Sequence, residues 1–220
     1  MNPLLALRDA LYFFSHNLLA IASLCLPLVV LEAVVQQQVT SQVGLESAMP
    51  YRLLVGLLFY PLYTGALILF LDARSQGQPP RLRDLLAASL GLWPRFALLA
   101  GLSALAIMLG ASLFILPGLW IMIKLSFAEF LLILRGLGPL KALQESFELT
   151  TGYFWPILLC VLGVMVPLWL VDWATQAGAD EQPDLLYGLL LYSLNGFLQL
   201  FATVVLFRLF MLRSALPAEG

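Results

Sequence analysis

Long apolar runs constrain this chain more than any other feature of its sequence. Hydrophobic residues make up 61% of its 220 residues, and charged residues make up only 11%. A soluble domain of this size cannot bury so much apolar surface, because its own exterior needs polar cover. The sequence therefore predicts an all-α integral membrane protein, in which lipid surrounds the apolar side chains.

The apolar runs predict six membrane spans. A span needs roughly 20 mostly apolar residues in a helix. Read as one helix, residues 95–135 would be about 60 Å long, roughly twice the hydrocarbon thickness, so we expect a hairpin at Leu116-Pro117-Gly118. The predicted spans are residues 17–36, 52–72, 95–116, 118–135, 155–174 and 185–212.

The positions of lysine and arginine predict the orientation. With the N-terminus inside, only Arg52 falls on the outer side and Lys124 falls within a span. The other nine basic residues are then cytoplasmic, as the positive-inside rule requires: Arg8, Arg74, Arg81, Arg83, Arg95, Arg135, Lys141, Arg208 and Arg213. We expect tryptophans to mark both interfaces, Trp93 and Trp155 the inner one and Trp120, Trp169 and Trp173 the outer one.

The segments before spans one, three and five resemble each other. Each begins with a proline suited to the first turn of a helix, at Pro3, Pro80 and Pro139, and each has an apolar face opposite charges. The interpretation is one domain, residues 1–220, of three transmembrane hairpins, each preceded by a cytoplasmic amphipathic helix. The pseudo-repeats would cover about 3–78, 80–136 and 139–213. The alternative is that any connector at the inner surface would look amphipathic.

Several short motifs resemble the YciC-type (UPF0259) family of bacterial inner-membrane proteins, and more loosely the membrane domain of some glycerophosphodiester phosphodiesterases. The motifs are spread over about half of the chain: Leu116-Pro117-Gly118, Leu125-Ser126-Phe127-Ala128, Gly138-Pro139-Leu140-Lys141-Ala142-Leu143, Ser146, Leu149-Thr150, Trp155 and Leu206-Phe207-Arg208-Leu209-Phe210-Met211-Leu212. The resemblance implies a six-span protein of the inner membrane. Lys124 and Glu129 stand where that family is expected to have apolar residues, so neither takes a role from it.

Charged and polar residues within spans are candidates for function because they are costly to insert. Lys124 and Glu129 lie in the fourth span, and Asn195, Gln199 and Thr203 recur every four residues along the last one. One hypothesis is that this stripe faces Glu129 and lines a small polar cavity. The other, which we favour from sequence, is hydrogen bonding between helices without transport. Lys124 is expected to extend toward the outer interface.

The loop between spans two and three carries Arg74, Arg81 and Arg83, which are candidates for binding lipid head groups, although they also serve the topology. Catalytic and metal motifs are missing, and the single histidine, His16, could not build a triad or a multi-histidine site. We therefore expect no enzyme and no cofactor. The net charge of −2 argues against a nucleic-acid partner.

These observations lead to two functional hypotheses. The first is a non-enzymatic scaffold or accessory factor of the bacterial envelope, whose partners are membrane lipids and a membrane protein. The alternative is a small transporter or lipid translocator with a polar cavity at mid-membrane.

Overall fold

The computed structural model describes residues 3–44, 47–177 and 185–214, and this part of the chain consists of helices and their connections, without strands. The helices are α1 (Pro3–His16), α2 (Leu18–Val43), α3 (Met49–Ser75), α4 (Leu82–Leu113), α5 (Ile115–Lys124), α6 (Ala128–Arg135), α7 (Pro139–Leu149), α8 (Phe154–Ala177) and α9 (Leu185–Ser214). The all-α class expected from the apolar runs is confirmed. Residues 45–46 and 178–184, which fall between predicted spans, lie outside the described residues.

Five helical stretches are long and apolar enough to cross a membrane. They are α2, α3, α4, the pair α5 and α6 taken together, and residues 189–214 of α9. A sixth is present if α7 and the first part of α8 count as one span, although they meet at an angle of 105°. Five to six candidate spans therefore agree with the polytopic membrane protein that the sequence predicts.

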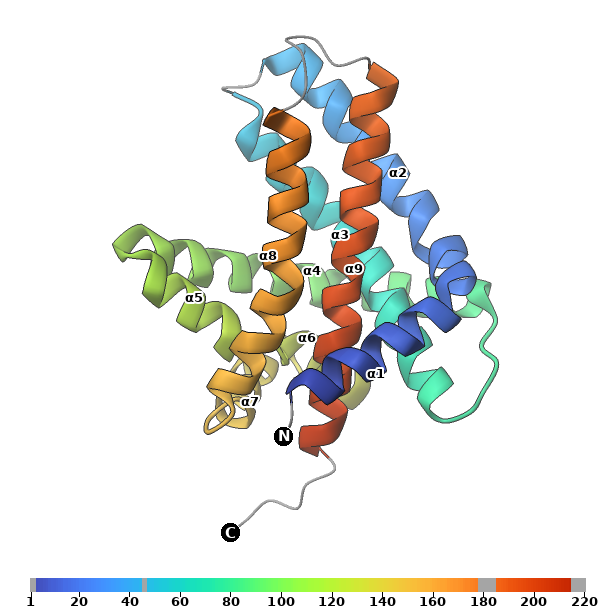
Figure 1. Cartoon of the computed structure of the whole chain (residues 1–220), viewed down its shortest axis with the longest axis vertical. Coiled ribbons are helices and arrows are strands. Elements are labelled where there is room, and N and C mark those ends of the chain that lie inside the picture. The colour runs from blue at the N-terminus through green and yellow to red at the C-terminus, as the bar shows by residue number, and fades with distance from the viewer. Residues whose placement is uncertain (1–2, 45–46, 178–184, 215–220) are drawn as a thin grey trace.

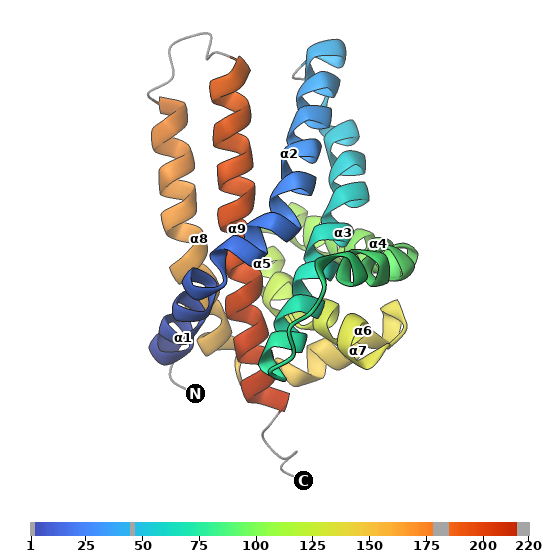
Figure 2. The same ribbon diagram turned by 90° about the vertical axis from the view of Figure 1, so that its right-hand side faces the viewer.

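Four helices form a bundle along the long axis of the molecule, and a fifth crosses it. Figure 1 shows α2, α3, α8 and α9 running along this axis, with α1 and the end of α9 at the same end of the molecule. Helix α4 lies across the bundle in Figure 1 and is seen nearly end-on in Figure 2, so it is roughly perpendicular to α9. Helix α4 therefore does not run beside the other long helices, as a simple row of hairpins would require.

The three segments that begin with prolines are not equivalent. The first and third form separate helices, α1 and α7, but the second continues without a break into the expected third span as the 32-residue α4. Helix α7 ends at Leu149, and Gly152, with a φ of +83°, turns the chain before α8. No residue of α4 has a positive φ, and Pro94 lies inside that helix without ending it. The surface helix predicted at Pro80 is therefore the first half of a longer helix.

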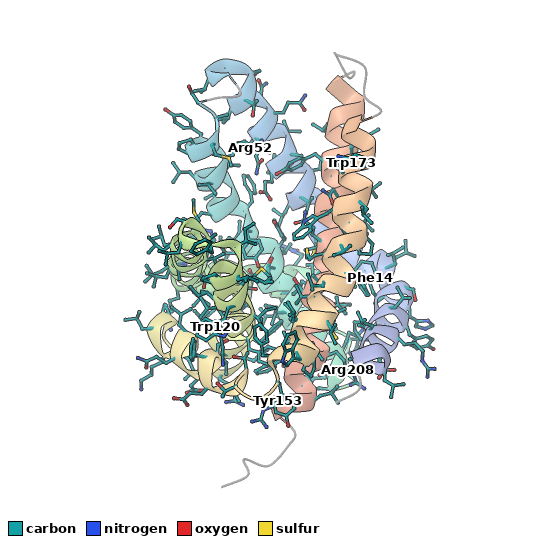
Figure 3. All side chains as sticks on the ribbon, turned by 60° about the vertical axis from the view of Figure 1, so that its left-hand side comes forward. Phe14, Arg52, Trp120, Tyr153, Trp173 and Arg208 are labelled. Atoms are coloured by element: carbon teal, nitrogen blue, oxygen red, sulfur yellow. The ribbon has the colours of Figure 1, made fainter. Side chains whose placement is uncertain are left out.

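The chain reverses at Phe114, two residues before the predicted turn, and α5 returns along α4. Gly118 is essential to this contact, because a Cβ at this position would lie 2.8 Å from the Cβ of Ala111 and 2.9 Å from its backbone. Gly110 faces Gly118 from the other helix at a similarly close distance. Because the hairpin lies across the bundle, Trp120 packs edge-on against Phe147 of α7, with ring centroids 5.2 Å apart, and not at the end marked by Trp173 (Figure 3).

The core lies where α3, α6 and α9 meet. Its largest fully buried side chains include Phe70 on α3, Phe96 on α4, and Phe127 and Phe130 at the start of α6. Phe130 stacks on Phe210 of α9 with ring centroids 5.4 Å apart. The aromatic packing holds α6 in place beside the cavity described below.

Candidate functional site

A cavity of about 450 Å³ opens between the bundle helices and the α4–α5 hairpin. Its wall is mostly apolar, with polar side chains from α2, α3, α4, α6 and α9 and from the segment between α5 and α6. Among the described residues, no Lys, Arg or His lines it. The polar lining residues are Glu32, Tyr60, Tyr63, Thr64, Ser103, Ser126, Glu129, Tyr192, Asn195, Gln199 and Thr203. We call this space the polar cavity.

Glu129 reaches the polar cavity through a break in the predicted fourth span. Helix α5 ends at Lys124 and α6 begins at Ala128, so Leu125, Ser126 and Phe127 are non-helical. The break places Glu129 in the first turn of α6, where the helix dipole favours a carboxylate. From α3, the hydroxyl of Tyr60 donates a hydrogen bond to Glu129 Oε1 at 2.7 Å. The sequence had suggested an unbroken helix here.

Helix α7 satisfies the backbone groups that the break leaves without helical partners. The buried hydroxyl of Ser146 accepts a hydrogen bond from Phe127 N at 3.1 Å and donates one to the Lys124 carbonyl at 2.8 Å. Thr150 Oγ1 also lies 3.4 Å from that carbonyl. Non-helical backbone is tolerated at membrane depth only where protein groups or water replace the missing bonds. Here the replacement is by side chains of α7.

Lys124 is buried against α7 and does not extend to the opposite interface. Its side chain is only 6% exposed, and its Nζ donates to Thr151 Oγ1 at 2.8 Å and to the Phe147 carbonyl at 3.4 Å. The rings of Phe147 and Trp120 lie 4.7 and 5.8 Å from Nζ. Both bonding partners are at the C-terminal end of α7, where the helix dipole favours a cation. The expectation that Lys124 extends outward was wrong, because the α4–α5 hairpin crosses the bundle.

The structure brings Glu129 together with the stripe on the last helix. Asn195, Gln199 and Thr203 all line the polar cavity from α9, and Glu129 lines it from α6. Their spacing of four residues keeps them on one face of α9, as the sequence indicated. Lys124 does not belong to this group.

Sequence reasoning missed a second carboxyl group, Glu32 on α2. It is 7% exposed, lines the polar cavity, and accepts a hydrogen bond from Gln36 Nε2 at 2.9 Å. Gln36 Oε1 in turn accepts bonds from the Tyr192 hydroxyl at 2.6 Å and from Arg52 Nε at 3.3 Å. The signal was available, since Glu32 lies within the predicted span 17–36 and intramembrane acids are rare.

Arg74, Arg81 and Arg83 do not form one site. Arg74 lines a separate hollow between α1, α3 and α9, whereas Arg81 and Arg83 are exposed at the start of α4 and do not line it. On α7, Glu145 forms an ion pair with Arg135 of α6, 3.5 Å apart. Within the described ranges, no group of three His, Cys, Asp or Glu residues could hold a metal.

The polar cavity has the features of a binding site. Its volume falls within the roughly 300–1,000 Å³ typical of small-molecule pockets, and a few polar groups converge in a mostly apolar wall. Two carboxyl groups without a basic residue on the wall favour ligands that bring hydrogen-bond donors or a positive charge. Amides and hydroxyls on α9 can orient the ligand.

Comparison with known proteins gives one family. Residues 31–212 match the model of the uncharacterised protein family UPF0259. A UPF0259 membrane protein from Sodalis glossinidius (strain morsitans) is 30% identical over 185 residues, covering 82% of this chain and 72% of the relative. No solved structure matches the chain.

Proposed function

This chain belongs to the UPF0259 family of membrane proteins, and from that premise we propose that it is a small transporter or lipid translocator. Its ligand is an amphipathic molecule with an amine-bearing head group, which binds in the polar cavity within the bilayer. The observation that carries the proposal is the break between α5 and α6, which places Glu129 on the cavity wall.

Broken helices are common at the substrate sites of transporters, because the freed helix ends and side chains can contact a ligand at mid-membrane. Here Ser146 of α7 and the following Thr150 form hydrogen bonds to the backbone at the break, so other parts of the fold stabilise it. Packing alone does not require a break whose backbone groups need partners from another helix. The proposal therefore gives the break a purpose that simple hydrogen bonding between spans does not.

The charges of the cavity point to the class of ligand. Glu32 and Glu129 approach the same space from α2 and α6, and they accept hydrogen bonds from neutral side chains, Gln36 and Tyr60. An ammonium group would bring three donors and a positive charge to these carboxyl groups. The apolar remainder of the wall suits the hydrocarbon part of the same ligand.

The test is a lipid-translocation assay in liposomes. Acyl-labelled fluorescent phosphatidylethanolamine, which keeps its free amine, is compared with acyl-labelled phosphatidylglycerol, and dithionite reports the label exposed outside. We expect the wild-type protein to move the ethanolamine lipid faster, and Glu129→Gln or Glu32→Gln to slow it about tenfold, the loss of one charged contact.

Glu148→Gln is the matched control, because Glu148 is exposed on α7 and does not line the cavity. The control is expected to keep wild-type rates. Equal rates in all four proteins, or no protein-dependent movement of either lipid, would refute the proposal.

An envelope scaffold is the second candidate, and the tip of the α4–α5 hairpin favours it. Leu113, Phe114, Ile115 and Leu116 are 71–83% exposed and project from the bundle. A partner membrane protein could cover this tip, as could lipid. A photo-crosslinking residue at Ile115 separates these outcomes, because only the scaffold gives a protein adduct of constant mass.

The location that we propose is the bacterial inner membrane, with both termini in the cytoplasm. The distribution of basic residues supports this orientation, since Arg208 lies near the end of the molecule that holds α7, and Arg52 lies near the opposite end (Figure 3). A fluorescent protein fused to the C-terminus should fold and emit if this end is cytoplasmic. Alkaline phosphatase fused there should be inactive.

A further inference from the structure

A second hollow, away from the polar cavity, lies between α1, α3 and α9. It has a volume of about 750 Å³ and is lined by both charged and apolar side chains. We propose that it binds one anionic phospholipid, with the phosphate on three arginines and the acyl chains against the apolar wall. This site is independent of the polar cavity and of the function proposed for it.

The charge of the hollow fits an anion. Arg8, Arg74 and Arg208 line it, and the single acid on its wall is Asp9. Asp9 Oδ2 pairs with Arg208 Nη2 at 3.1 Å, which leaves an excess of two positive charges. Guanidinium groups bind phosphate with paired hydrogen bonds, so two or three of them around one space form a strong phosphate site.

The three arginines come from distant parts of the sequence. Arg8 is on α1, Arg74 is near the end of α3, and Arg208 is near the end of α9. The fold brings these three arginines to one hollow. Arg81 and Arg83 are closer to Arg74 in sequence but do not line it. General attraction to an anionic membrane surface would not require this convergence.

The apolar side chains lie deeper in the molecule than the arginines. Helices α3 and α9 both run toward the end of the molecule near α1, as Figures 1 and 2 show. Leu71 precedes Arg74 on α3 by about one turn, and Val204 precedes Arg208 on α9 in the same way, and all four line the hollow. The arginines are therefore nearer the interface, and the apolar residues are nearer the centre of the bundle.

This order of charge and apolar surface matches a phospholipid and not a free phosphate. A soluble phosphate compound would use the arginines alone and leave Phe13, Leu71 and Phe207 without a ligand partner. A lipid of the leaflet on this side can place its phosphate on the arginines and its first methylene groups along these side chains.

The experiment measures lipid retention by native mass spectrometry on the full chain. The protein is released from nanodiscs of phosphatidylcholine that also contain phosphatidylglycerol. We expect wild type to retain one phosphatidylglycerol and Arg8→Gln/Arg74→Gln to retain about tenfold less. Both substituted residues are exposed, so the fold is expected to persist. Arg208 is left unchanged because it also pairs with Asp9.

The matched control is Arg81→Gln/Arg83→Gln, which removes the same number of positive charges from residues that lie close to Arg74 in sequence but outside the hollow. The control should retain lipid as wild type does. Equal loss in both double variants would show surface attraction, and equal retention would show that the hollow binds nothing; either result overturns the proposal. Glycerol phosphate at about millimolar concentration is added as a soluble competitor. If it displaces the lipid, the site binds a soluble anion instead of a lipid, and the proposal is also overturned.

Discussion

Ser146→Ala is the sharpest test of how the break between α5 and α6 is held. Ser146 is fully buried, and its hydroxyl contacts two backbone groups of the non-helical segment, Phe127 N and the Lys124 carbonyl. The substitution removes one oxygen atom and changes the volume little. Any large effect must therefore come from the lost hydrogen bonds.

The magnitude follows from what each backbone group has left. Ser146 is the partner the structure gives to Phe127 N, so this N–H becomes a buried donor without an acceptor, at a cost of about 1–3 kcal/mol. The Lys124 carbonyl keeps Thr150 Oγ1 at 3.4 Å, so its loss is smaller. We expect the free energy of unfolding to fall by about 2–3 kcal/mol, well above the roughly 0.6 kcal/mol average for hydrogen bonds between membrane helices.

The assay is reversible unfolding in mixed micelles with increasing dodecyl sulfate, followed by far-ultraviolet circular dichroism. Ser112→Ala is the control, because Ser112 is exposed and its hydroxyl bonds only to Leu109 O of its own helix. The control is expected within about 0.5 kcal/mol of wild type. If the free energy of unfolding of Ser146→Ala also falls within that range, α7 does not stabilise the break. The argument for a transporter-like site at the break is then lost.

Further substitutions test three other contacts, each in the same unfolding assay. Lys124→Met should change the free energy of unfolding by less than about 1 kcal/mol, because it removes a buried charge together with its hydrogen bonds. Thr151→Val should lower it by about 1–3 kcal/mol, because the buried ammonium of Lys124 keeps fewer partners. A larger loss for Lys124→Met than for Thr151→Val would contradict this reasoning. Gly118→Ala should lower the free energy of unfolding by about 1–3 kcal/mol, because the new Cβ forces α4 and α5 apart. Gly101→Ala is the control and should not destabilise the protein, because its new Cβ meets nothing nearer than 3.8 Å. Equal effects of the two substitutions would refute the close contact at Gly118. Glu145→Ala breaks a half-exposed ion pair and should cost under about 1 kcal/mol, and a larger loss would show that the pair supports α7.

The candidate site was only partly visible in the sequence. The four-residue spacing of Asn195, Gln199 and Thr203 indicates a polar stripe without any structure, because helix geometry alone places these residues on one face. What they face depends on packing. Glu32 was overlooked although the same rule that selected Glu129 applied to it, and only the fold shows that both residues line one cavity.

The predictions from sequence that were wrong concern where helices begin and end. The break after Lys124 has no Pro or Gly at residues 125–127 to announce it, since its backbone groups are satisfied by Ser146 and Thr150 from another helix. The continuous α4 was missed for the opposite reason. Pro94 indicates a boundary, yet the helix continues through it.

Composition and the length of the apolar runs indicated by themselves that this chain is helical and belongs in a membrane, because runs of about 20 apolar residues satisfy their backbone groups as helices and cover their apolar surface with lipid. Only the tertiary structure decided that α4 lies across the bundle, that Lys124 contacts α7, and that two carboxyl groups share a cavity. Local sequence sets whether a segment is helical. The direction in which each helix runs depends on close contacts between helices, such as the contact of Gly118 with Ala111. These contacts form only when the whole chain has packed.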